Sequence, residues 1–324
     1  MTDAPRAVVV GAGVIGCTTA LALLADGWEV DLLTAEDPRA TTSAVAAAFW
    51  YPYLVDDSPV AEAWGRATAE RLAALCDVPG AGVTARTVHE RFREADVDPA
   101  WRAGMPDAAR EADDLEDPFL DGWRYTSWVA AMPTYLSWLL AQLDGAGVKV
   151  AQVMLDSLDD AWRPGVDLVV DCAGVGARAL ADDESVVPVA GQALLVRTED
   201  LTEPIEEVWL DAGHPDGPAY VVPRGDGTVL CGGTSVEGQV DRTADPDVTA
   251  DIMARCRALV PALEGVEPFA AGVGLRPSRP TVRLELGPGR DCLVLHHYGH
   301  GGAGLTLSWG SAADAALLAR NIKG

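Results

Sequence analysis

The chain has 324 residues, of which 49% are hydrophobic and 23% charged, which is ordinary for a globular protein with a sizeable core. This length can accommodate two domains of about 150 residues each. Its 49 acidic residues against 24 basic ones give a net charge of −25. That charge argues against nucleic acids and anionic membranes as partners, because both attract clustered positive charge.

Six cysteines are scattered along the chain without a C-x-x-C pair, and several of them lie in apolar runs. This pattern predicts free thiols in a reducing compartment rather than disulfides. The chain also lacks an S-K-L ending, which would direct it to the peroxisome. We therefore expect a cytoplasmic protein.

The chain opens with the pattern strand, glycine turn, helix, strand. The apolar run at Arg6–Val10 is typical of a buried strand, Val14–Ala25 is an apolar helix closed by Gly27, and Glu29–Leu33 is a second strand. Two parallel strands need such a crossover connection, so this opening implies a parallel sheet. An α/β domain is therefore predicted.

The turn after the first strand reads Gly-Ala-Gly-Val-Ile-Gly and matches G-x-G-x-x-G in the setting of a nucleotide site. The first glycine allows the tight turn, the second lets a pyrophosphate approach the backbone, and the third lets the helix and strand pack closely. The N-terminus of the helix attracts the negative charge. We therefore expect a dinucleotide to bind at Gly11, Ala12, Gly13, Val14, Ile15 and Gly16.

An acidic residue at the end of the second strand commonly binds a ribose hydroxyl of the dinucleotide. The expected place in this chain is Thr34 or Ala35, and the nearest acid, Glu36, lies just beyond it. Glu36 is therefore the candidate for this contact, and the alternative is that other groups hold the ribose.

The rest of the chain divides into helical and strand-rich parts. We predict helices at 61–75, 133–143 and 307–322 and strands at 149–153 and 166–171. From Val186 to Gly233, alternating segments predict antiparallel strands, with a hairpin turn at "RGDG", residues 224–227.

A second glycine-rich loop, "GHGGAGLT" at residues 299–306, leads into the last helix. Its backbone N–H groups and the helix dipole provide a second positive N-terminus. A flavin gains negative charge when it accepts hydride, and such a terminus stabilises that charge, whereas a nicotinamide cofactor has no comparable need. The two motifs together favour FAD over NAD.

With these motifs in place, the sequence resembles the D-amino acid oxidase family of FAD enzymes over nearly the whole chain. The resemblance is carried by "VVVGAGVIG" (8–16), "TTSAVAAAFWYPYL" (41–54), "YLSWLLAQLDGAGVKV" (135–150), "DCAGVGAR" (171–178), "GLRPSRPTVRLE" (274–285) and "HHYGHGGAGLTLSWGSA" (296–312). The arginine-rich and GHGG segments are far more specific than the dinucleotide turn.

The resemblance implies an α/β fold with a Rossmann-like FAD-binding domain, discontinuous in sequence, and a second, antiparallel-sheet substrate domain. We expect the FAD-binding domain to comprise residues 1–55, 130–185 and 274–324. Residues 56–129 and 186–273 are expected to form the substrate-binding domain.

The basic run at 274–285 is out of character in so acidic a chain. Taken as one extended strand, it places Arg276 on an inward, largely apolar face and Arg279 and Arg283 on a solvated face. An inward guanidinium needs an anion, and an amino-acid carboxylate fits its bidentate geometry. From the residues alone a buried ion pair is the alternative, but the resemblance implies that Arg276 binds the substrate carboxylate.

The resemblance also implies other groups at the substrate. The Tyr220 hydroxyl is expected to bind the same carboxylate, although tyrosine is also common in strands for packing alone. The backbone carbonyl of Gly302 is expected to accept the substrate amine. Asp216 stands where vertebrate members of the family carry a second tyrosine on a lid, and its loop, "DAGHPDGPA" at residues 211–219, is short and polar.

Two aromatic residues, Phe49 and Tyr51, are expected to line the pocket above the flavin. The alternative is that they form a core aromatic cluster with Trp50 and Tyr53.

The resemblance implies a further set of cofactor contacts. Hydroxyls would meet phosphate or flavin, small residues would let the backbone come close, and a backbone group would pair with the adenine. These residues are Thr41, Thr42, Ser43, Ala46, Ala47 and Leu155, together with Gly301, Gly304, Leu305 and Thr306 of the second glycine loop.

The implied function is FAD-dependent oxidative deamination of neutral D-amino acids, by hydride transfer from Cα to flavin N5, to 2-oxo acids, ammonia and hydrogen peroxide. Alternatives are a glycine or secondary-amine oxidase of the same superfamily, an NAD-dependent dehydrogenase or a non-catalytic nucleotide-binding module. A D-aspartate oxidase would need another inward cation. Arg224 shares a strand face with Tyr220, but it lies at the hairpin turn and is expected to point to solvent.

The expected partners are a D-amino acid and molecular oxygen, with no nucleic acid and no membrane, and a homodimer is compatible with the sequence. No metal is expected, since His296, His297 and His300 lie in a glycine loop without carboxylates at a helpful spacing.

Overall fold

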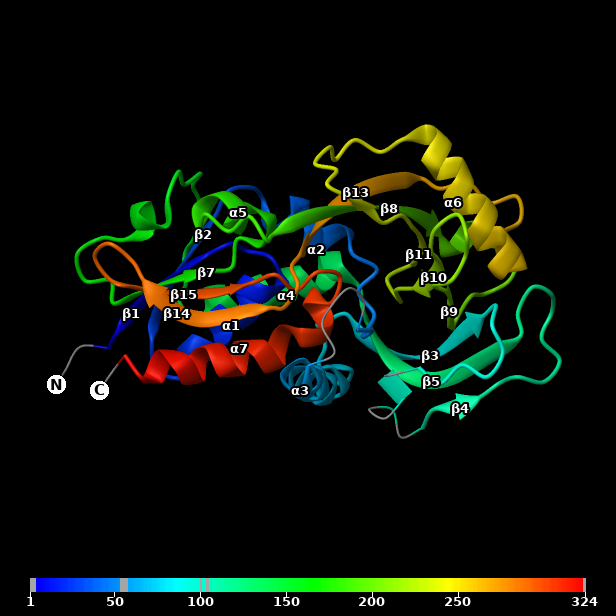
Figure 1. The fold of residues 1–324 in the computed structure, drawn as a ribbon, viewed down its shortest axis with the longest axis horizontal. Coiled ribbons are helices and arrows are strands. Elements are labelled where there is room, and N and C mark those ends of the chain that lie inside the picture. The colour runs from blue at the N-terminus through cyan, green and yellow to red at the C-terminus, as the bar shows by residue number, and fades with distance from the viewer. Residues whose placement is uncertain (1–3, 53–57, 100, 103–104, 106, 323–324) are drawn as a thin grey trace.

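The computed structural model describes residues 4–52, 58–99, 101–102, 105 and 107–322, and in it two sheets lie side by side (Figure 1). One sheet has six strands and is mostly parallel, and the other has nine and is mostly antiparallel. The α/β class with one parallel and one antiparallel sheet is therefore confirmed.

The six-stranded sheet is built around the βαβ unit at the start of the chain. Its strands, in spatial order, are β14 (Arg283–Pro288), β15 (Leu293–Tyr298), β7 (Leu168–Asp171), β1 (Arg6–Val10), β2 (Glu29–Thr34) and β6 (Val150–Gln152). All neighbours are parallel except β14 and β15, which form an antiparallel hairpin. The predicted opening is confirmed, including helix α1 (Val14–Ala25).

The strand β1 is buried on both faces, which explains its continuous apolar run. Ala7 and Val9 belong to the cluster that includes residues of α1, α4 (Met132–Gly145) and α7 (Gly304–Arg320). Val8 and Val10 pack on the other face, against the short helix η3 (Leu158–Ala161).

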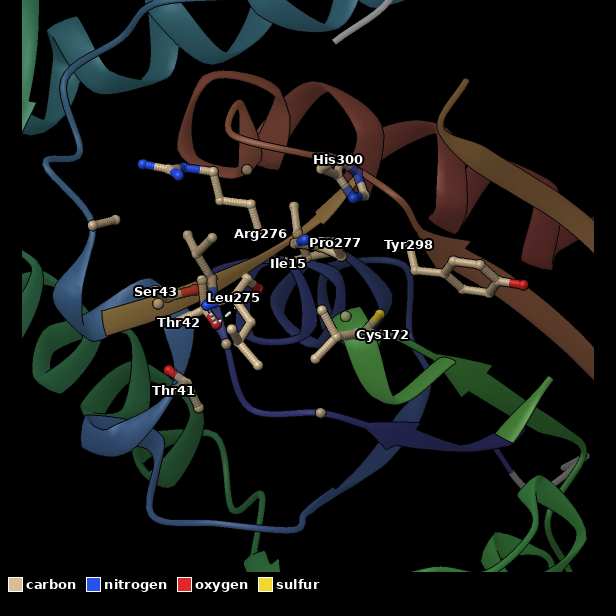
Figure 2. A pocket seen from close by; sticks show the side chains of 18 of the residues that line it. Ile15, Thr41, Thr42, Ser43, Cys172, Leu275, Arg276, Pro277, Tyr298 and His300 are labelled. Carbon is tan, nitrogen blue, oxygen red and sulfur yellow. Dashed lines mark hydrogen bonds between the residues drawn. The ribbon is translucent and has the colours of Figure 1, made fainter. Parts of the chain in front are cut away.

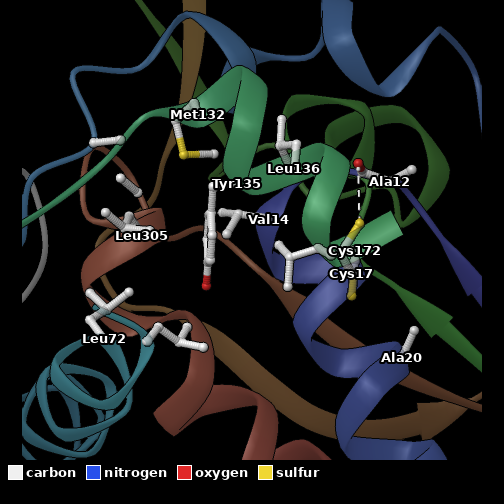
Figure 3. Packing of buried hydrophobic residues seen from close by; sticks show 14 of the residues in the cluster. Ala12, Val14, Cys17, Ala20, Leu72, Met132, Tyr135, Leu136, Cys172 and Leu305 are labelled. Carbon is white, nitrogen blue, oxygen red and sulfur yellow. Dashed lines mark hydrogen bonds between the residues drawn. The ribbon is translucent and has the colours of Figure 1, made fainter. Parts of the chain in front are cut away.

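Three helices meet in the core beside this sheet. Figure 3 shows Val14 of α1, Tyr135 of α4 and Leu305 of α7 in one buried cluster, with the Cys17 thiol donating a hydrogen bond to the Ala12 carbonyl. Because Val14 and Leu305 lie in the first turns of their helices, this packing fixes where both helix N-termini end up.

The nine-stranded sheet contains the long strand β8 (Val187–Arg197), which pairs with three other strands of the sheet. Its strands are β12 (Val236–Glu237), β8, β11 (Thr228–Gly232), β10 (Ala219–Pro223), β9 (Val208–Asp211), β3 (Val83–Phe92), β5 (Asp121–Ala130) and β4 (Ala109–Arg110), with β13 (Ala270–Ser278) also paired to β8. Helix α6 (Pro246–Leu259) packs on this sheet. The predicted hairpin is confirmed, because β10 and β11 pair around residues 224–227.

The remaining elements are short, apart from α3 (Pro59–Leu75), which packs against α7. They are η1 (Pro38–Ala40), α2 (Thr42–Val45), η4 (Gly174–Gly176), α5 (Ala177–Leu180), η5 (Thr198–Asp200) and η6 (Pro261–Leu263).

The prediction that 274–285 forms one extended strand is wrong. β13 ends at Ser278 and β14 begins at Arg283, and the two strands belong to different sheets. Pro280, in the gap between them, lacks the N–H that a ladder needs. The alternation of faces therefore does not carry through the run.

Two other expectations need correction. Within residues 56–129 the sequence predicted a helix at 61–75 and no individual strand, whereas β3 and β5 are ten-residue strands that pair along their whole length. The last helix begins at Gly304, three residues before the predicted start at Leu307.

The six strands of the parallel sheet all come from the three segments expected to bind FAD. The division into two domains nevertheless stays a prediction, and its boundary at 55/56, like Tyr53, lies outside the described residues.

Prediction of free thiols is confirmed, because all six cysteines are unpaired and four of them are buried. Across the described ranges of the chain, the helices are too short or too polar for any of them to span a bilayer.

The contact between α3 and α7 gives a test of the packing. A Cβ added at Gly310 would lie 2.3 Å from the Trp64 carbonyl oxygen. We predict that Gly310→Ala lowers the free energy of unfolding by about 1–3 kcal/mol, because the two helix backbones would be forced apart. Denaturant titration followed by circular dichroism measures this change.

The matched control is Gly145→Ala at the end of α4, where an added Cβ would have no atom within 4 Å. This variant should be neutral or slightly stabilising, since alanine is the better helix former. Equal stability of the Gly310→Ala protein and the wild type would contradict the close helix contact.

Candidate active site

One cavity of about 570 Å³ runs between the two sheets and is lined by residues from both. Figure 2 shows Ile15 of α1, Thr42 and Ser43 of α2, and Arg276 of β13 around it. The cavity therefore brings the dinucleotide turn together with the basic run, two motifs more than 250 residues apart in the sequence.

The glycine turn is packed as the sequence predicted. A Cβ on Gly11, whose φ is +110°, would lie 2.3 Å from the Cys172 carbonyl oxygen, and one on Gly16 would lie 1.8 Å from the Gly11 carbonyl oxygen. Gly11 and Gly13 line the cavity, whereas Gly16 does not and serves the close contact between helix and strand. Ala12, Val14 and Ile15 also line the cavity.

Two helix N-termini open onto this cavity, and in neither does the N-cap residue itself supply a capping side chain. The N-cap of α1 is Gly13 and that of α7 is Ala303, and neither helix has an acidic residue in its first turn. The positive ends of both helix dipoles are therefore not matched by protein carboxylates, which suits an anionic ligand.

The hydroxyls of the 41–43 segment line the cavity but already have partners. Thr41 donates to the Pro38 carbonyl at 2.7 Å, and Ser43 accepts from the Val14 N–H at 3.0 Å. Thr42 donates to the Leu275 carbonyl at 3.0 Å and accepts from its N–H at 3.1 Å. These bonds tie α2 to β13 and α1, so the hydroxyls position the cavity wall.

Glu36 lines the cavity, and its carboxylate pairs with Arg242 at 2.7 Å. Arg242 also donates to the Ala40 carbonyl. Sequence reasoning missed this pair because 206 residues separate the partners and nothing local marks the contact. The expected ribose contact of Glu36 stays a prediction.

At the other end of the cavity, Arg276 lies on the backbone of β8. Its Nη1 donates to the Thr234 carbonyl at 3.0 Å, and a Cβ added at Gly191 would lie 2.2 Å from the same nitrogen. Tyr220 also lies on glycines: a Cβ on Gly232 would come 2.1 Å from its ring carbon Cζ. Both side chains line the cavity, so glycine backbones make room for the expected carboxylate-binding pair.

The other two arginines of the basic run are half-buried and paired rather than directed to solvent, so the expected solvated face is wrong. Arg279 Nε lies 3.0 Å and Arg283 Nη1 3.6 Å from Asp183 Oδ2, and the Tyr298 hydroxyl donates to the same oxygen at 2.9 Å. Burial alone would raise the pKa of the Asp183 carboxyl, but hydrogen bonds from Ser185 and Tyr298 and the charge of Arg279 hold it well below its usual value. These arginines are structural.

Phe49 and Tyr51 both line the cavity, with ring centroids 5.5 Å apart. Thr306 lies outside the cavity lining and fixes Tyr51 instead, because its hydroxyl accepts from the Tyr51 N–H at 3.0 Å and donates to the Tyr51 carbonyl at 2.7 Å. The Tyr51 hydroxyl donates to Glu90 at 2.7 Å. Trp50 is buried and bonded to the Gly65 carbonyl.

Glu90 is a further residue near the site that the sequence did not single out. Its side chain is buried, with only 1% of the residue exposed. Burial raises the pKa of its carboxyl to about 7, although the neighbouring Tyr51, Trp101 and Tyr125 side chains act to lower it. A carboxyl group that gains its proton near neutral pH thus lies directly behind the cavity wall.

The loop that carries Asp216 contributes Ala212 and Pro218 to the cavity, but Asp216 itself is exposed and does not line it. Its N–H bonds to His214 Nδ1 at 3.2 Å. The expected pocket position of Asp216 is therefore wrong, because the side chain turns to solvent. Among the other expected residues, the following do line the cavity: Ala46, Ala47, Leu155, Gly301, Gly302, Gly304 and Leu305.

The expectation that Arg224 points to solvent is also wrong. The side chain is 2% exposed, because the turn begins only after it, and its Nη2 donates to the Ala46 carbonyl at 2.8 Å. Within the described residues its Nε has no hydrogen-bond partner. Burial lowers the pKa of this guanidinium.

Comparison with known proteins decides the family. The profile described as "FAD dependent oxidoreductase", abbreviated DAO, matches residues 6–318. The chain belongs to this family. Its cofactor is accordingly FAD.

Full-length relatives carry related names. The D-amino-acid oxidase of Rubrobacter xylanophilus is 43% identical over 318 residues, which cover 97% of this chain and 95% of that protein. The D-amino-acid oxidase of Streptomyces coelicolor is 38% identical, covering 96% of each chain. Human D-aspartate oxidase is 33% identical, covering 98% of this chain and 95% of that one.

Solved structures show the same fold at lower identity. Glycine oxidase from Bacillus cereus superposes with a TM-score of 0.79 at 17% identity, over 98% of this chain and 95% of that one. Glycine oxidase from Geobacillus kaustophilus gives a TM-score of 0.76 at 20% identity, over 98% and 94% of the two chains.

The residues that line the cavity fit FAD. The glycine turn and the N-terminus of α1 would hold the pyrophosphate, and Thr41–Ser43 with Ala46 and Ala47 would lie beside the cofactor. The uncapped N-terminus of α7 suits a group that becomes negatively charged on reduction.

The raised pKa of Glu90 makes stability depend on pH. The pKa of Glu90 is 4.5 in the unfolded chain and about 7 in the folded protein. Between these two pH values the folded protein holds a proton on Glu90 that the unfolded chain has released. The free energy of unfolding should therefore fall as pH rises through this window, by up to about 3 kcal/mol from this group. Glu90→Gln should lack this part of the fall.

Denaturant titrations of both proteins at about pH 5 and about pH 8 measure the difference. If the variant and the wild type lose the same stability between these two conditions, Glu90 has an ordinary pKa and the account of its burial fails.

Proposed function

We propose that the protein oxidises neutral D-amino acids, converting substrate, oxygen and water to a 2-oxo acid, ammonia and hydrogen peroxide. The observation that carries the proposal is the shared cavity, in which a dinucleotide turn and an inward arginine with a tyrosine line one space. Two relatives of 38% and 43% identity named D-amino-acid oxidase support the substrate class.

In this proposal Arg276 and Tyr220 bind the substrate carboxylate. A guanidinium offers two parallel N–H donors to a carboxylate, and a phenol adds a third. Arg276 lies against Gly191, and Tyr220 against Gly232 and Gly233, so both side chains are held by rigid strand backbone before substrate arrives. Pre-set orientation of this kind lowers the entropic part of the barrier.

Bound FAD would supply the hydride acceptor for the substrate Cα–H. The backbone carbonyl of Gly302 accepts a hydrogen bond from the substrate amine, which with the carboxylate contacts orients Cα. The N-terminus of α7 provides electrostatic stabilisation at the place where negative charge develops. No side chain of the pocket is required as a general base.

One observation favours a second candidate, an acidic D-amino acid as substrate. Arg224 is an inward, buried cation, as a D-aspartate oxidase would require, and human D-aspartate oxidase is 33% identical. Arg224 does not line the cavity, however, and donates instead to the Ala46 carbonyl. The neutral substrate class is therefore the better supported one.

We further propose a cytoplasmic location, supported by six unpaired cysteines. Molecular oxygen as the electron acceptor follows from the oxidase relatives, and a homodimer stays a prediction.

The assignment of Arg276 predicts a selective loss. Arg276→Ala should lower kcat/KM for D-alanine by roughly 30-fold to several thousand-fold, equivalent to about 2–5 kcal/mol, chiefly through KM. FAD should stay bound, as its visible absorbance shows. The control is Arg279→Ala in the same basic run, which should lower thermal stability and leave KM unchanged, because Arg279 pairs with Asp183. Loss of FAD from Arg276→Ala, or an equal rise of KM in Arg279→Ala, would contradict the assignment.

Gly191→Ala provides a gentler perturbation of the same group. Its Cβ would displace the Arg276 guanidinium without removing the charge. KM should rise while the fold and FAD content are retained.

A further inference from the structure

Glu90 is a buried carboxyl group that the proposed mechanism does not use. It lies in β3, is 1% exposed, and accepts a hydrogen bond from the Tyr51 hydroxyl at 2.7 Å. The Tyr125 hydroxyl lies 3.5 Å from its second oxygen. A buried carboxylate is costly in free energy, so its position next to the substrate cavity calls for a reason.

The register of the sheet places Glu90 on the same face as the carboxylate-binding tyrosine. Glu90 pairs with Leu210 of β9, and Leu210 pairs with Tyr220 of β10. Paired residues on neighbouring strands project to the same side, and two strand spacings put the Glu90 and Tyr220 backbones about 10 Å apart. Leu210 and Tyr220 both line the cavity.

Tyr51 connects the carboxyl group to the cavity. Its ring lines the cavity beside Phe49, and Thr306 holds both its N–H and its carbonyl. Because the backbone of Tyr51 is fixed, its hydroxyl has a defined place against Glu90. The charge of Glu90 thus acts on the cavity through protein, where it is screened less than in water.

The groups that face Glu90 are uncharged. They are the two phenols and the indole of Trp101. Its chain neighbours His89 and Arg91 project to the opposite face, where both bind Glu111, at 2.9 Å and 3.0 Å. Among the described residues no Lys, Arg or His forms an ion pair with Glu90.

The neighbouring strand β9 (Val208–Asp211) also directs no charged side chain toward Glu90. Asp211 follows Leu210, projects away from the cavity face, and pairs with Arg93 at 2.6 Å. The buried cation on the same sheet face, Arg224, bonds to the Ala46 carbonyl and forms no ion pair with Glu90 among the described residues. The ionised form of Glu90 is therefore a negative charge without a paired cation behind the wall formed by Tyr51 and Leu210.

We propose that Glu90 determines the charge preference of the substrate site, selecting against acidic side chains and leaving neutral and cationic ones. This inference rests on the proposed function and refines its substrate class. The selection strengthens as Glu90 loses its proton near neutral pH, and it disfavours D-aspartate as a substrate despite the buried Arg224.

D-Asparagine and D-aspartate form the matched substrate pair, because they have nearly the same shape and differ by one charge. The ratio of their kcat/KM values cancels the titration of the cofactor and most of the titration of the amine, whose pKa is higher in D-aspartate. In the FAD-loaded wild type this ratio should rise about tenfold in favour of D-asparagine between about pH 6 and about pH 8.5. In Glu90→Gln it should be about tenfold lower at the higher pH and independent of pH.

Tyr51→Phe is the second variant, which keeps the ring and removes the hydrogen bond. Loss of this bond raises the pKa of Glu90 further, so the rise of the ratio should move to higher pH. Infrared difference spectra report the proton itself: the band of a protonated carboxyl should disappear on raising the pH in the wild type and be missing in Glu90→Gln.

A ratio that is unchanged by Glu90→Gln, in a folded protein that turns over D-alanine, would overturn the charge selection alone. Failure of the FAD-loaded wild type to oxidise D-alanine and D-asparagine would overturn the proposed function and this inference with it. If Glu90→Gln does not fold, a pH-independent ratio in the wild type and in Tyr51→Phe overturns the inference.

Discussion

The short segment from Gly274 to Glu285 joins the two sheets, and the active site depends on where it crosses. Its first half is the end of β13, paired to β8, and its second half begins β14 in the parallel sheet. Asp183 fixes the crossing, because it receives Arg279 and Arg283 on one carboxylate oxygen. The three arginines therefore have different roles. Arg279 and Arg283 bind Asp183 and stabilise the crossing, whereas Arg276 lines the cavity between the sheets.

Everything else at the site is arranged around that junction. Thr42 bonds to Leu275, the residue before Arg276, and so attaches the wall of the cofactor cavity to the strand that binds substrate. The first turns of α1 and α7 share one buried cluster, which brings both helix dipoles to the same space. Glycine backbone under Arg276 and Tyr220 leaves room for their side chains. Positioning and electrostatics, rather than acid–base groups, are what this cavity offers to the reaction.

Local signals made much of this predictable. The βαβ opening and the glycine turn follow from short-range pattern, and the β10–β11 hairpin follows from its turn residues. The features that were not predicted from the sequence depend on contacts between distant segments. The buried position of Arg224 goes with a bond to the Ala46 carbonyl, 178 residues away. Glu90 is buried among side chains from distant segments, Tyr51 and Tyr125 among them, and this burial raises its pKa. The strand β3 was missed because its charged face is buried by such contacts rather than exposed.

The proposed function requires that a D-amino acid reduces the flavin bound in this cavity. Its most direct test is the visible spectrum of the FAD-loaded protein without oxygen, recorded before and after addition of D-alanine or L-alanine. We expect the flavin bands to bleach with D-alanine and to stay unchanged with L-alanine. Bands that persist with D-alanine, or that bleach equally with both isomers, would contradict the account.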